Sequence, residues 1–235
     1  MTPRRASAQS PVDPRTAPAY TLAEGARYLR LAPGTLRSWV VGREYPASDG
    51  ARRFTPLIRP ARKNPLTLSF LDLLEAHVLR ALRVDHRVKV DAVRKAIRYA
   101  ERELGIERVL LSEDLRTNAG KLFLDQYGHL IELSASGQLA MRKVFEDHLS
   151  RVDWAADKLP FRLYPFVSSD TMTAARPIAI DARIAFGRPI LHRTGVSTRV
   201  IAERLDAGES LDALVADYDV TPADIEQAVL YERVA

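Results

Sequence analysis

The chain contains no cysteine among its 235 residues, which excludes disulfide bonds and a zinc site built on thiolates. It also lacks any apolar run close to the ~20 residues that a membrane-spanning helix needs. Residues 1–18 lack the apolar core of a signal peptide and are rich in Pro, Ser, Ala and Arg, a composition typical of a disordered tail. These absences lead us to expect a cytoplasmic protein with no membrane partner.

The sequence motifs of common enzyme classes are missing as well. There is no Gly-rich phosphate loop and no His-Glu-x-x-His zinc motif. The densest carboxylates occupy positions expected at helix ends and turns, where an acid stabilises local structure without a metal: Asp212, Asp217, Asp219, Asp224 and Glu226. We therefore expect no catalytic residue, no metal site, no cofactor and no enzymatic activity.

The net charge of +5 is distributed unevenly along the chain. Residues 1–65 contain 12 Lys or Arg against 4 Asp or Glu, whereas residues 177–235 contain 6 against 10. The basic front favours a phosphate-bearing partner, because each neutralised phosphate releases condensed counterions. The acidic end indicates either a different partner or an ordinary solvated surface.

Residues 21–39 predict two short helices joined by a tight corner. Thr21 and Glu24 have the spacing of a capping box, and Pro33 suits the first position of the second helix. Two helices across so short a turn are typical of a helix-turn-helix, whose second helix lies in the DNA major groove. An ordinary corner between two packed helices has the same pattern, so both interpretations stay open at this point.

A basic hairpin follows the second helix. Asp49-Gly50 predicts a two-residue turn with arginines on both sides. The order of capped helix, Thr-Leu-Arg-Ser-Trp helix and basic hairpin resembles the winged helix-turn-helix of MerR-like regulators over residues 20–60. We expect the second helix and hairpin to approach base edges through Thr35, Arg37, Ser38 and Arg43, and to contact phosphates through Arg52 and Arg53.

Two longer helices are predicted next, at about Phe70–Leu82 and Asp91–Leu104. Their apolar faces are the expected surface of a homodimer, since repressors present two recognition helices to half-sites about one DNA turn apart. Leu139–Trp154 is the second candidate for that surface. From residue 107 the pattern changes to short strands, with a hairpin at Tyr127–His129, then a helix through Trp154 and an extended apolar segment.

Residues 177–235 predict a compact unit of two short strands and three helices, at about Thr198–Asp206, Leu211–Tyr218 and Pro222–Glu232. The three helices resemble a homeodomain-like fold. The segment as a whole resembles a small domain of unknown function that is common in bacterial VapB-type antitoxins. The matching positions are spread over nearly the whole unit: Asp181, Arg183, Gly187, Arg188, Pro189, Gly208, Glu209, Ser210, Asp217, Tyr218, Thr221, Pro222, Ile225 and Ala228.

This resemblance implies that a PIN-domain ribonuclease toxin and operator DNA are the partners. A PIN nuclease carries clustered acids around its metal site, so arginines on a Gly/Pro-containing segment are the expected toxin contacts: Arg183, Arg188 and Arg193. In the competing interpretation, Gly187 and Pro189 only shape a turn and Arg188 pairs internally with Asp181.

The predicted fold is α+β and mainly helical, in four parts: a disordered tail at 1–18, a MerR-like winged helix-turn-helix with two supporting helices at 19–106, a β-hairpin and helix region at 107–167, and the C-terminal helical unit at 177–235. The predicted function is an antitoxin that neutralises its toxin and represses its own operator. The alternatives are a stand-alone MerR-like regulator that senses a ligand through its C-terminal half, and a structural module or unrecognised enzyme.

Overall fold

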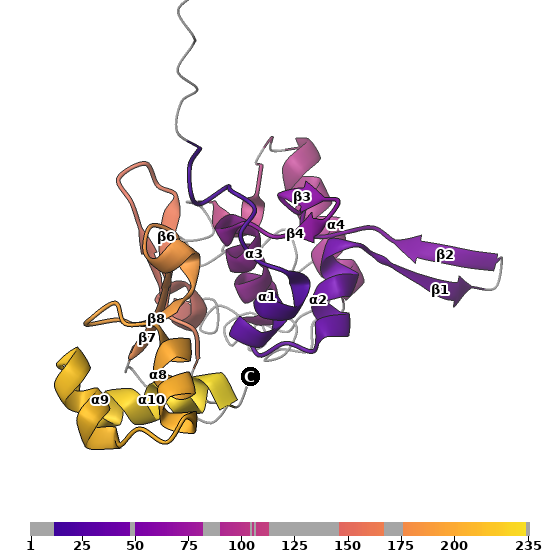
Figure 1. Ribbon diagram of the computed structural model, residues 1–235. Coiled ribbons are helices and arrows are strands. Elements are labelled where there is room, and N and C mark those ends of the chain that lie inside the picture. The colour runs from indigo at the N-terminus through magenta and orange to yellow at the C-terminus, as the bar shows by residue number, and fades with distance from the viewer. Residues whose placement is uncertain are drawn as a thin grey trace, which may run out of the picture.

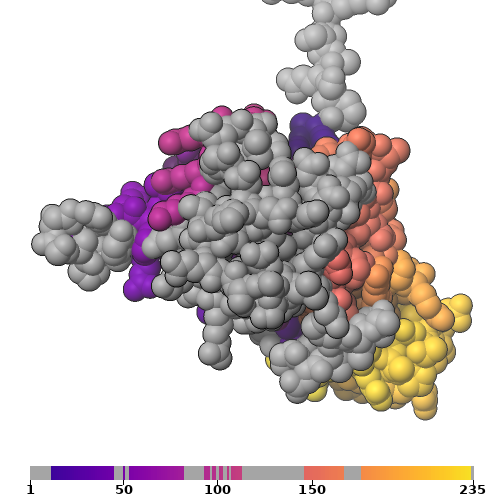
Figure 2. Space-filling view, turned by 180° about the vertical axis from the view of Figure 1, so that it is seen from behind, coloured from indigo at the N-terminus to yellow at the C-terminus, as the bar shows by residue number. Residues whose placement is uncertain are grey.

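A computed structural model of the chain describes residues 12–47, 50–81, 90–103, 105, 107–112, 146–166 and 176–233. The expected α+β architecture is confirmed, with short helices and small antiparallel sheets arranged along an elongated body (Figure 1). The N-terminal hairpin and the C-terminal helices lie at opposite sides of the molecule, as the view from behind also shows (Figure 2). No helix in these ranges is both long and apolar enough to cross a membrane.

The first two helices form where the capping pattern places them. Helix α1 spans Leu22–Tyr28, and its capping box is complete: the Glu24 N–H donates to the Thr21 hydroxyl, and the Thr21 N–H donates to the Glu24 carboxylate. Helix α2 spans Pro33–Val40 with proline in its first turn and no side-chain cap on Ala32. Their buried side chains join the main core beneath them.

The predicted hairpin is an antiparallel ribbon of β1 (Arg43–Ala47) and β2 (Gly50–Phe54), which projects from the body beyond α2 (Figure 1). Gly42 permits the turn from α2 into β1. Its φ is +87°, and a Cβ atom there would lie 2.2 Å from the Phe54 carbonyl oxygen. A residue with a side chain would therefore push the end of the ribbon away from α2.

A short ribbon of β3 (Arg62–Lys63) and β4 (Leu66–Thr67) leads into helix α3 (Phe70–Arg80). Ser69 and Asp72 form a capping box at its start. Every residue of α3 from Phe70 to Leu79 is buried within the single chain. The expectation that this helix supplies a dimer surface is therefore wrong, because its apolar side chains already form the centre of the monomer core. Helix α4 (Val90–Glu103) lies beside the segment that follows β2, where the Arg94 side chain donates to the Thr55 carbonyl oxygen.

Residues 107–167 differ in part from the prediction. The 3₁₀ turn η2 (Val109–Leu111) packs on α3, and the predicted hairpin at 127–129 lies outside the described residues. The helix predicted to run through Trp154 ends at Leu149, and Val152–Trp154 instead form strand β5. The reason is tertiary: Val152 pairs with Leu163 of strand β6 (Pro160–Leu163), an interaction that helical periodicity cannot reveal.

Strands β5 and β6 continue into β7 (Ile178–Asp181) and β8 (Pro189–Leu191), which gives one antiparallel sheet of order β5-β6-β7-β8. Arg162 pairs with Asp181 in the register between β6 and β7. One sheet thus joins the region predicted at 107–167 to the unit predicted at 177–235. The C-terminal helices are attached to the rest of the chain through backbone hydrogen bonds.

The three C-terminal helices match their predicted bounds closely, as α8 (Thr198–Asp206), α9 (Leu211–Tyr218) and α10 (Pro222–Arg233). They enclose a second core whose fully buried members include Ile178, Ile201, Leu214, Ile225 and Tyr231. This core is separate from the one around α3, so the C-terminal helices have their own packing and a distinct attachment to the body.

That attachment includes direct contacts between α10 and α1. The buried Tyr231 hydroxyl donates to the Tyr28 carbonyl oxygen at 3.0 Å, and Arg27 pairs with Glu232. The segment that precedes α1 is also attached: Arg15 pairs with Asp13 and, at 2.6 Å, with Asp157. The prediction that the tail is disordered through residue 18 is therefore wrong for the segment around Asp13 and Arg15.

Candidate nucleic-acid interface and partner-facing loop

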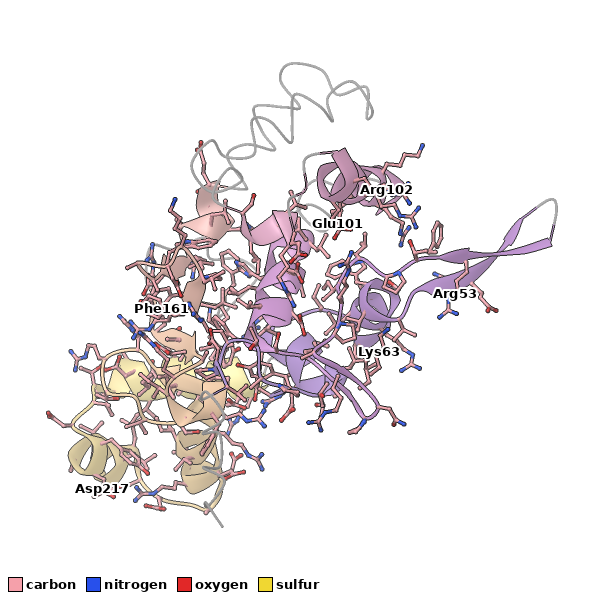
Figure 3. The ribbon with its side chains drawn as sticks, turned by 90° about the horizontal axis from the view of Figure 1, so that it is seen from above. Arg53, Lys63, Glu101, Arg102, Phe161 and Asp217 are labelled. Atoms are coloured by element: carbon pink, nitrogen blue, oxygen red, sulfur yellow. The ribbon has the colours of Figure 1, made fainter. Side chains whose placement is uncertain are left out.

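The two sets of predicted site residues lie in different parts of the fold. Those proposed for DNA are on α2 and the β1–β2 ribbon, and those proposed for the toxin are on the turn between β7 and β8 and just after β8. Figure 3 shows these parts at opposite sides of the molecule, with Arg53 on the β1–β2 ribbon, Lys63 closer to the body and Asp217 among the C-terminal helices. Each set is described by itself.

On α2, Arg37 is exposed, whereas Thr35 and Ser38 are half-buried. The Ser38 hydroxyl donates to the Thr35 carbonyl oxygen at 2.7 Å, so its proton is already used within the helix. Arg37 forms no hydrogen bond or ion pair with any residue that the structure describes. Arg37 is the most exposed of the three predicted residues on this helix, and its donors are free to meet an acceptor outside the chain.

The ribbon arginines differ in their surroundings. Arg43 is exposed at the start of β1, opposite Phe54, and Arg52 lies opposite Tyr45 in the register. Arg53 is exposed and donates to the Val41 carbonyl oxygen at 3.1 Å. Residues directly opposite share a face and neighbours alternate, so Arg43 and Arg53 lie on opposite faces of the ribbon.

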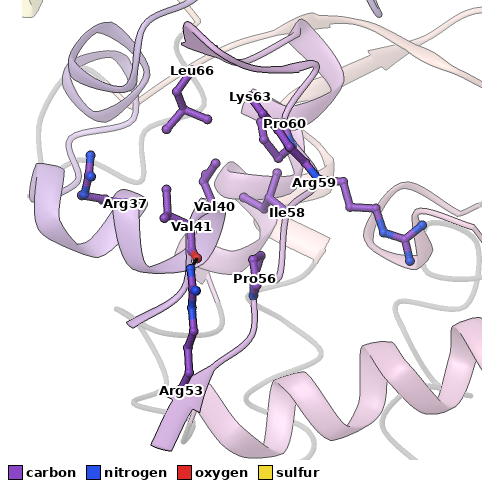
Figure 4. Close-up of a pocket in the computed structure, with 10 residues that line it drawn as sticks. All are labelled: Arg37, Val40, Val41, Arg53, Pro56, Ile58, Arg59, Pro60, Lys63 and Leu66. Carbon is purple, nitrogen blue, oxygen red and sulfur yellow. Dashed lines mark hydrogen bonds between the residues drawn. The ribbon is translucent and has the colours of Figure 1, made fainter. Parts of the chain in front are cut away.

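The structure brings Arg37 and Arg53 together around one pocket with a volume of ≈ 670 Å³ (Figure 4). Two further cations at this pocket, Arg59 and Lys63, were not predicted from the sequence. The available signal was the basic run from Arg59 to Lys63 directly after the hairpin. The sequence alone does not show which side chains of this run face α2, because the pairing of β3 with β4 decides their directions.

The arginines predicted to meet a toxin are mostly paired within the chain. Arg183 binds Asp181 through two side-chain nitrogens at 3.0 and 2.9 Å and lies over the Phe161 ring, 3.8 Å from its centroid. Arg162 binds the same carboxylate at 3.0 Å. Burial raises the pKa of Asp181, but the hydrogen bonds from Arg183 and Arg162 outweigh it and hold the pKa below its usual value.

Arg188 bonds to α1 rather than to Asp181. It donates to the Glu24 carboxylate at 2.6 Å and to the Tyr28 hydroxyl at 3.3 Å. The alternative in which Arg188 pairs with Asp181 is therefore wrong, since Arg183 occupies that place. Burial raises the pKa of Glu24, yet the hydrogen bonds from Thr21 and the charge of Arg188 lower it below its ordinary value.

Arg193 is the exception among the three. It is exposed just after β8 and has no hydrogen bond or ion pair within the described ranges. A residue that the sequence did not single out lies on the preceding turn, the 3₁₀ segment η3 (Ala185–Gly187). Phe186 is 92% exposed there, and its φ of +53° is rare for a residue with a side chain.

The surroundings of η3 hold Phe186 in this position. Gly187 has a φ of +73°, and its carbonyl accepts a 3.1 Å hydrogen bond from the fully buried Tyr20 hydroxyl. A Cβ atom on Gly187 would lie 2.1 Å from that hydroxyl oxygen. Aromatic side chains are enriched in protein interfaces, and strained backbone clusters at functional sites, so Phe186 is a candidate contact with a partner.

Three comparisons show which known proteins this chain resembles. Residues 178–231 match the family model described as "Protein of unknown function (DUF433)". The chain is 28% identical over 232 residues to a Mycobacterium tuberculosis protein named "putative antitoxin VapB45", covering 90% of this chain and 92% of that protein. The resemblance to VapB-type antitoxins is confirmed. This relative extends along both predicted units, not only the C-terminal one.

The fold also has a solved counterpart. The crystal structure of Rv2018 from Mycobacterium tuberculosis superposes with a TM-score of 0.65, covering 91% of this chain and 98% of that one at 23% identity. At this identity the likeness concerns the fold. Within the described residues, no group of three or more His, Asp or Glu side chains is placed to hold a metal ion.

Proposed function

We propose that this protein is the antitoxin of a toxin–antitoxin pair, which binds and inhibits a PIN-domain ribonuclease and binds operator DNA to repress its own transcription. The observation that carries the proposal is the alignment with a protein named as a VapB antitoxin over nine-tenths of the chain. The relative spans the basic ribbon and the C-terminal helices together, as a protein with two partners requires.

DNA binding is assigned to α1, α2 and the β1–β2 ribbon, as a MerR-like winged helix-turn-helix. Arg37, Arg43 and Arg53 are exposed and have no carboxylate partner in the part of the chain that the structure describes. Cations in this state gain most from a phosphate or a base edge, since no internal ion pair has to be broken first. A homodimer would present two such units to the two halves of an operator.

The DNA half is tested with the full chain and a labelled duplex from the region upstream of its own gene. Arg37→Ala should weaken binding by ~1–3 kcal/mol, which is the value of a bidentate base contact, and should relax specificity at one position. Arg193→Ala is the matched control, because it removes another exposed arginine, which lies just after β8 rather than on α2. Equal affinities for wild type and Arg37→Ala would contradict the assignment of α2.

Toxin binding is assigned to residues 177–235, centred on the turn that carries Phe186 and on Arg193. Arg183 and Arg188 are assigned a structural role, in which they hold the turn between β7 and β8 in place. Their guanidinium groups already bind the carboxylates of Asp181 and Glu24. Since β7 pairs with β6, the full chain is the correct reagent, and the C-terminal unit should not be cut away from its sheet.

Co-purification with a tagged nuclease from the neighbouring gene, followed by an RNA-cleavage assay, tests this half. Phe186→Ala and Arg193→Glu should each reduce binding and restore RNA cleavage, and Arg37→Ala should leave inhibition unchanged. If Arg37→Ala releases the nuclease while Phe186→Ala does not, the toxin surface is on the N-terminal half. Light scattering at micromolar concentration tests the homodimer, for which a monomeric mass is the contrary result.

A further inference from the structure

The pocket beside α2 combines an apolar wall with a ring of cations (Figure 4). Its volume of ≈ 670 Å³ lies within the range of small-molecule sites. The wall comes from α2, the segment after β2 and strand β4: Val40, Val41, Pro56, Ile58 and Leu66. The cations come from α2, β2 and the β3 region: Arg37, Arg53, Arg59 and Lys63. No carboxylate is among these lining residues.

The wall is held in place by backbone hydrogen bonds. The Trp39 carbonyl oxygen accepts from the N–H groups of both Leu57 and Ile58, at 2.7 and 3.1 Å. Ile58 is fully buried, so the floor of the pocket is part of the protein core. A ligand would therefore enter a formed site rather than have to order one, which lowers the entropic cost of binding.

The four cations are not equivalent. Arg53 is fixed across one side of the pocket by its hydrogen bond to the Val41 carbonyl oxygen, and Arg59 pairs with Glu101 of α4 at 3.0 Å. Arg37 and Lys63 make no hydrogen bond or ion pair with described residues. Two unpaired cations with no acid in the lining give the pocket a positive potential that an anion would relieve.

We propose that this pocket binds a small organic anion: a carboxylate, sulfonate or phosphate group attached to an aromatic or branched aliphatic body. An inorganic anion would leave the accessible part of the apolar wall, formed by Val41, Pro56 and Leu66, in water. A neutral apolar molecule would leave Arg37 and Lys63 unpaired. Only a ligand with both parts satisfies the whole lining. If the proposed DNA role of Arg37 and Arg53 is correct, the ligand occupies two operator contacts and competes with DNA.

The probe for the test is 1-anilinonaphthalene-8-sulfonate, whose fluorescence rises when its aromatic body leaves water. Titration of the full chain should give one saturable site. Lys63→Glu should weaken this site at least ~10-fold, because reversing the charge replaces an attraction by a repulsion. Arg62→Glu is the matched control: it makes the same charge change one residue earlier on β3, at a position that does not line the pocket. It should change affinity less than ~2-fold.

N-phenyl-1-naphthylamine, which is the same aromatic body without the sulfonate, tests the anionic part. It should bind at least ~10-fold more weakly, and inorganic sulfate alone should displace the probe only at far higher concentration. Equal effects of Lys63→Glu and Arg62→Glu, equal binding of the neutral analogue, or the absence of a saturable site would each overturn the proposal. Circular dichroism of both variants must match wild type, as expected for exposed residues of a two-residue strand.

Operator DNA is added last, so that the pocket and the DNA role are judged separately. Displacement of the bound probe by the operator duplex supports competition. If the duplex binds without displacing the probe, competition is overturned while the site stands. If the duplex does not bind at all, the proposed operator role fails, and the Lys63-dependent probe titration still decides whether the pocket takes an organic anion.

Discussion

The N-terminal ribbon and the C-terminal turn both rely on arginine, but the two regions leave it in opposite states. On α2 and the ribbon, Arg37 and Arg43 are exposed without a carboxylate partner among the described residues. Around β7 and β8, Arg183 and Arg188 are held by Asp181 and Glu24. The net charge of a segment therefore does not say what its arginines do. The free ones are available to an outside partner, and the paired ones join parts of the fold.

The largest expected effect at a single pH comes from the contact that joins the C-terminal turn to the N-terminal core. Gly187→Ala places a Cβ against the buried Tyr20 hydroxyl at a positive φ. Left-handed strain of ~1–3 kcal/mol and overpacking of ~1–3 kcal/mol should together lower the free energy of unfolding by about 4 kcal/mol in urea denaturation.

Gly195→Ala is the matched control for that substitution. Gly195 also has a positive φ, of +75°, but no atom lies within 4 Å of the position that a Cβ would take there. Only the left-handed strain should remain, at ~1–3 kcal/mol. Equal losses in the two variants would mean that the Tyr20 contact does not lock the turn.

A change of pH should act on the N-terminal core through Glu75. Burial raises the pKa of Glu75 to about 8, although Arg108 lies 2.8 Å from it. The folded carboxyl keeps a proton that the unfolded chain, with a pKa near 4.5, releases. The resulting stability is complete below that value and is lost as the pH rises to about 8, by up to ~1.4 kcal/mol per pH unit.

The measurement is the difference in unfolding free energy between wild type and Glu75→Gln at several pH values between about 5 and 8, the window in which the two pKa values of Glu75 differ. Burial lowers the pKa of His77, which gives stability the opposite pH dependence, so the difference isolates Glu75. Glu44→Gln on the exposed ribbon serves as the control and should leave the slope unchanged. Parallel curves for wild type and Glu75→Gln would refute a protonated Glu75.

The attachment of α10 to α1 has a smaller expected effect. Tyr231→Phe removes the donor to the buried Tyr28 carbonyl oxygen and should lower the unfolding free energy by ~1–2 kcal/mol in urea denaturation. Tyr218→Phe, at a half-buried position on α9, should cost less. If Tyr231→Phe leaves the free energy of unfolding unchanged, the two regions are joined chiefly by the sheet and the Arg188–Glu24 pair.

The smallest expected effect is on the salt dependence of operator binding. Arg53→Ala should weaken binding to all sequences alike and reduce the slope of log affinity against log salt by ~0.9, the value for one phosphate. Anisotropy titrations between ~50 and ~200 mM salt measure it. Arg183→Ala should leave the slope unchanged, because that arginine is engaged by Asp181. A reduced slope for Arg183→Ala would break the distinction between free and paired arginines.

The sequence by itself determined the elements that depend on neighbours a few residues apart. The capping box at Thr21 and the bounds of α8, α9 and α10 follow from local patterns, and the structure has them close to where they were predicted. The basic ribbon was predicted from Asp49-Gly50, but Gly50 pairs with Ala47 as the first residue of β2, so the predicted turn was placed one residue too late. Caps, turns and helix faces are local interactions, so a short stretch of sequence contains nearly all their information.

Only the tertiary structure decided how those elements meet. The end of the predicted helix at Trp154 became a strand because β6 pairs with it, and α3 became the centre of the core rather than a free face. Glu24, predicted only as a cap, also holds Arg188 from 164 residues away. The tertiary fold decides which cations remain unpaired, because each carboxylate pairs with the arginine that the fold places beside it. The spacing of residues in the sequence does not contain that geometry.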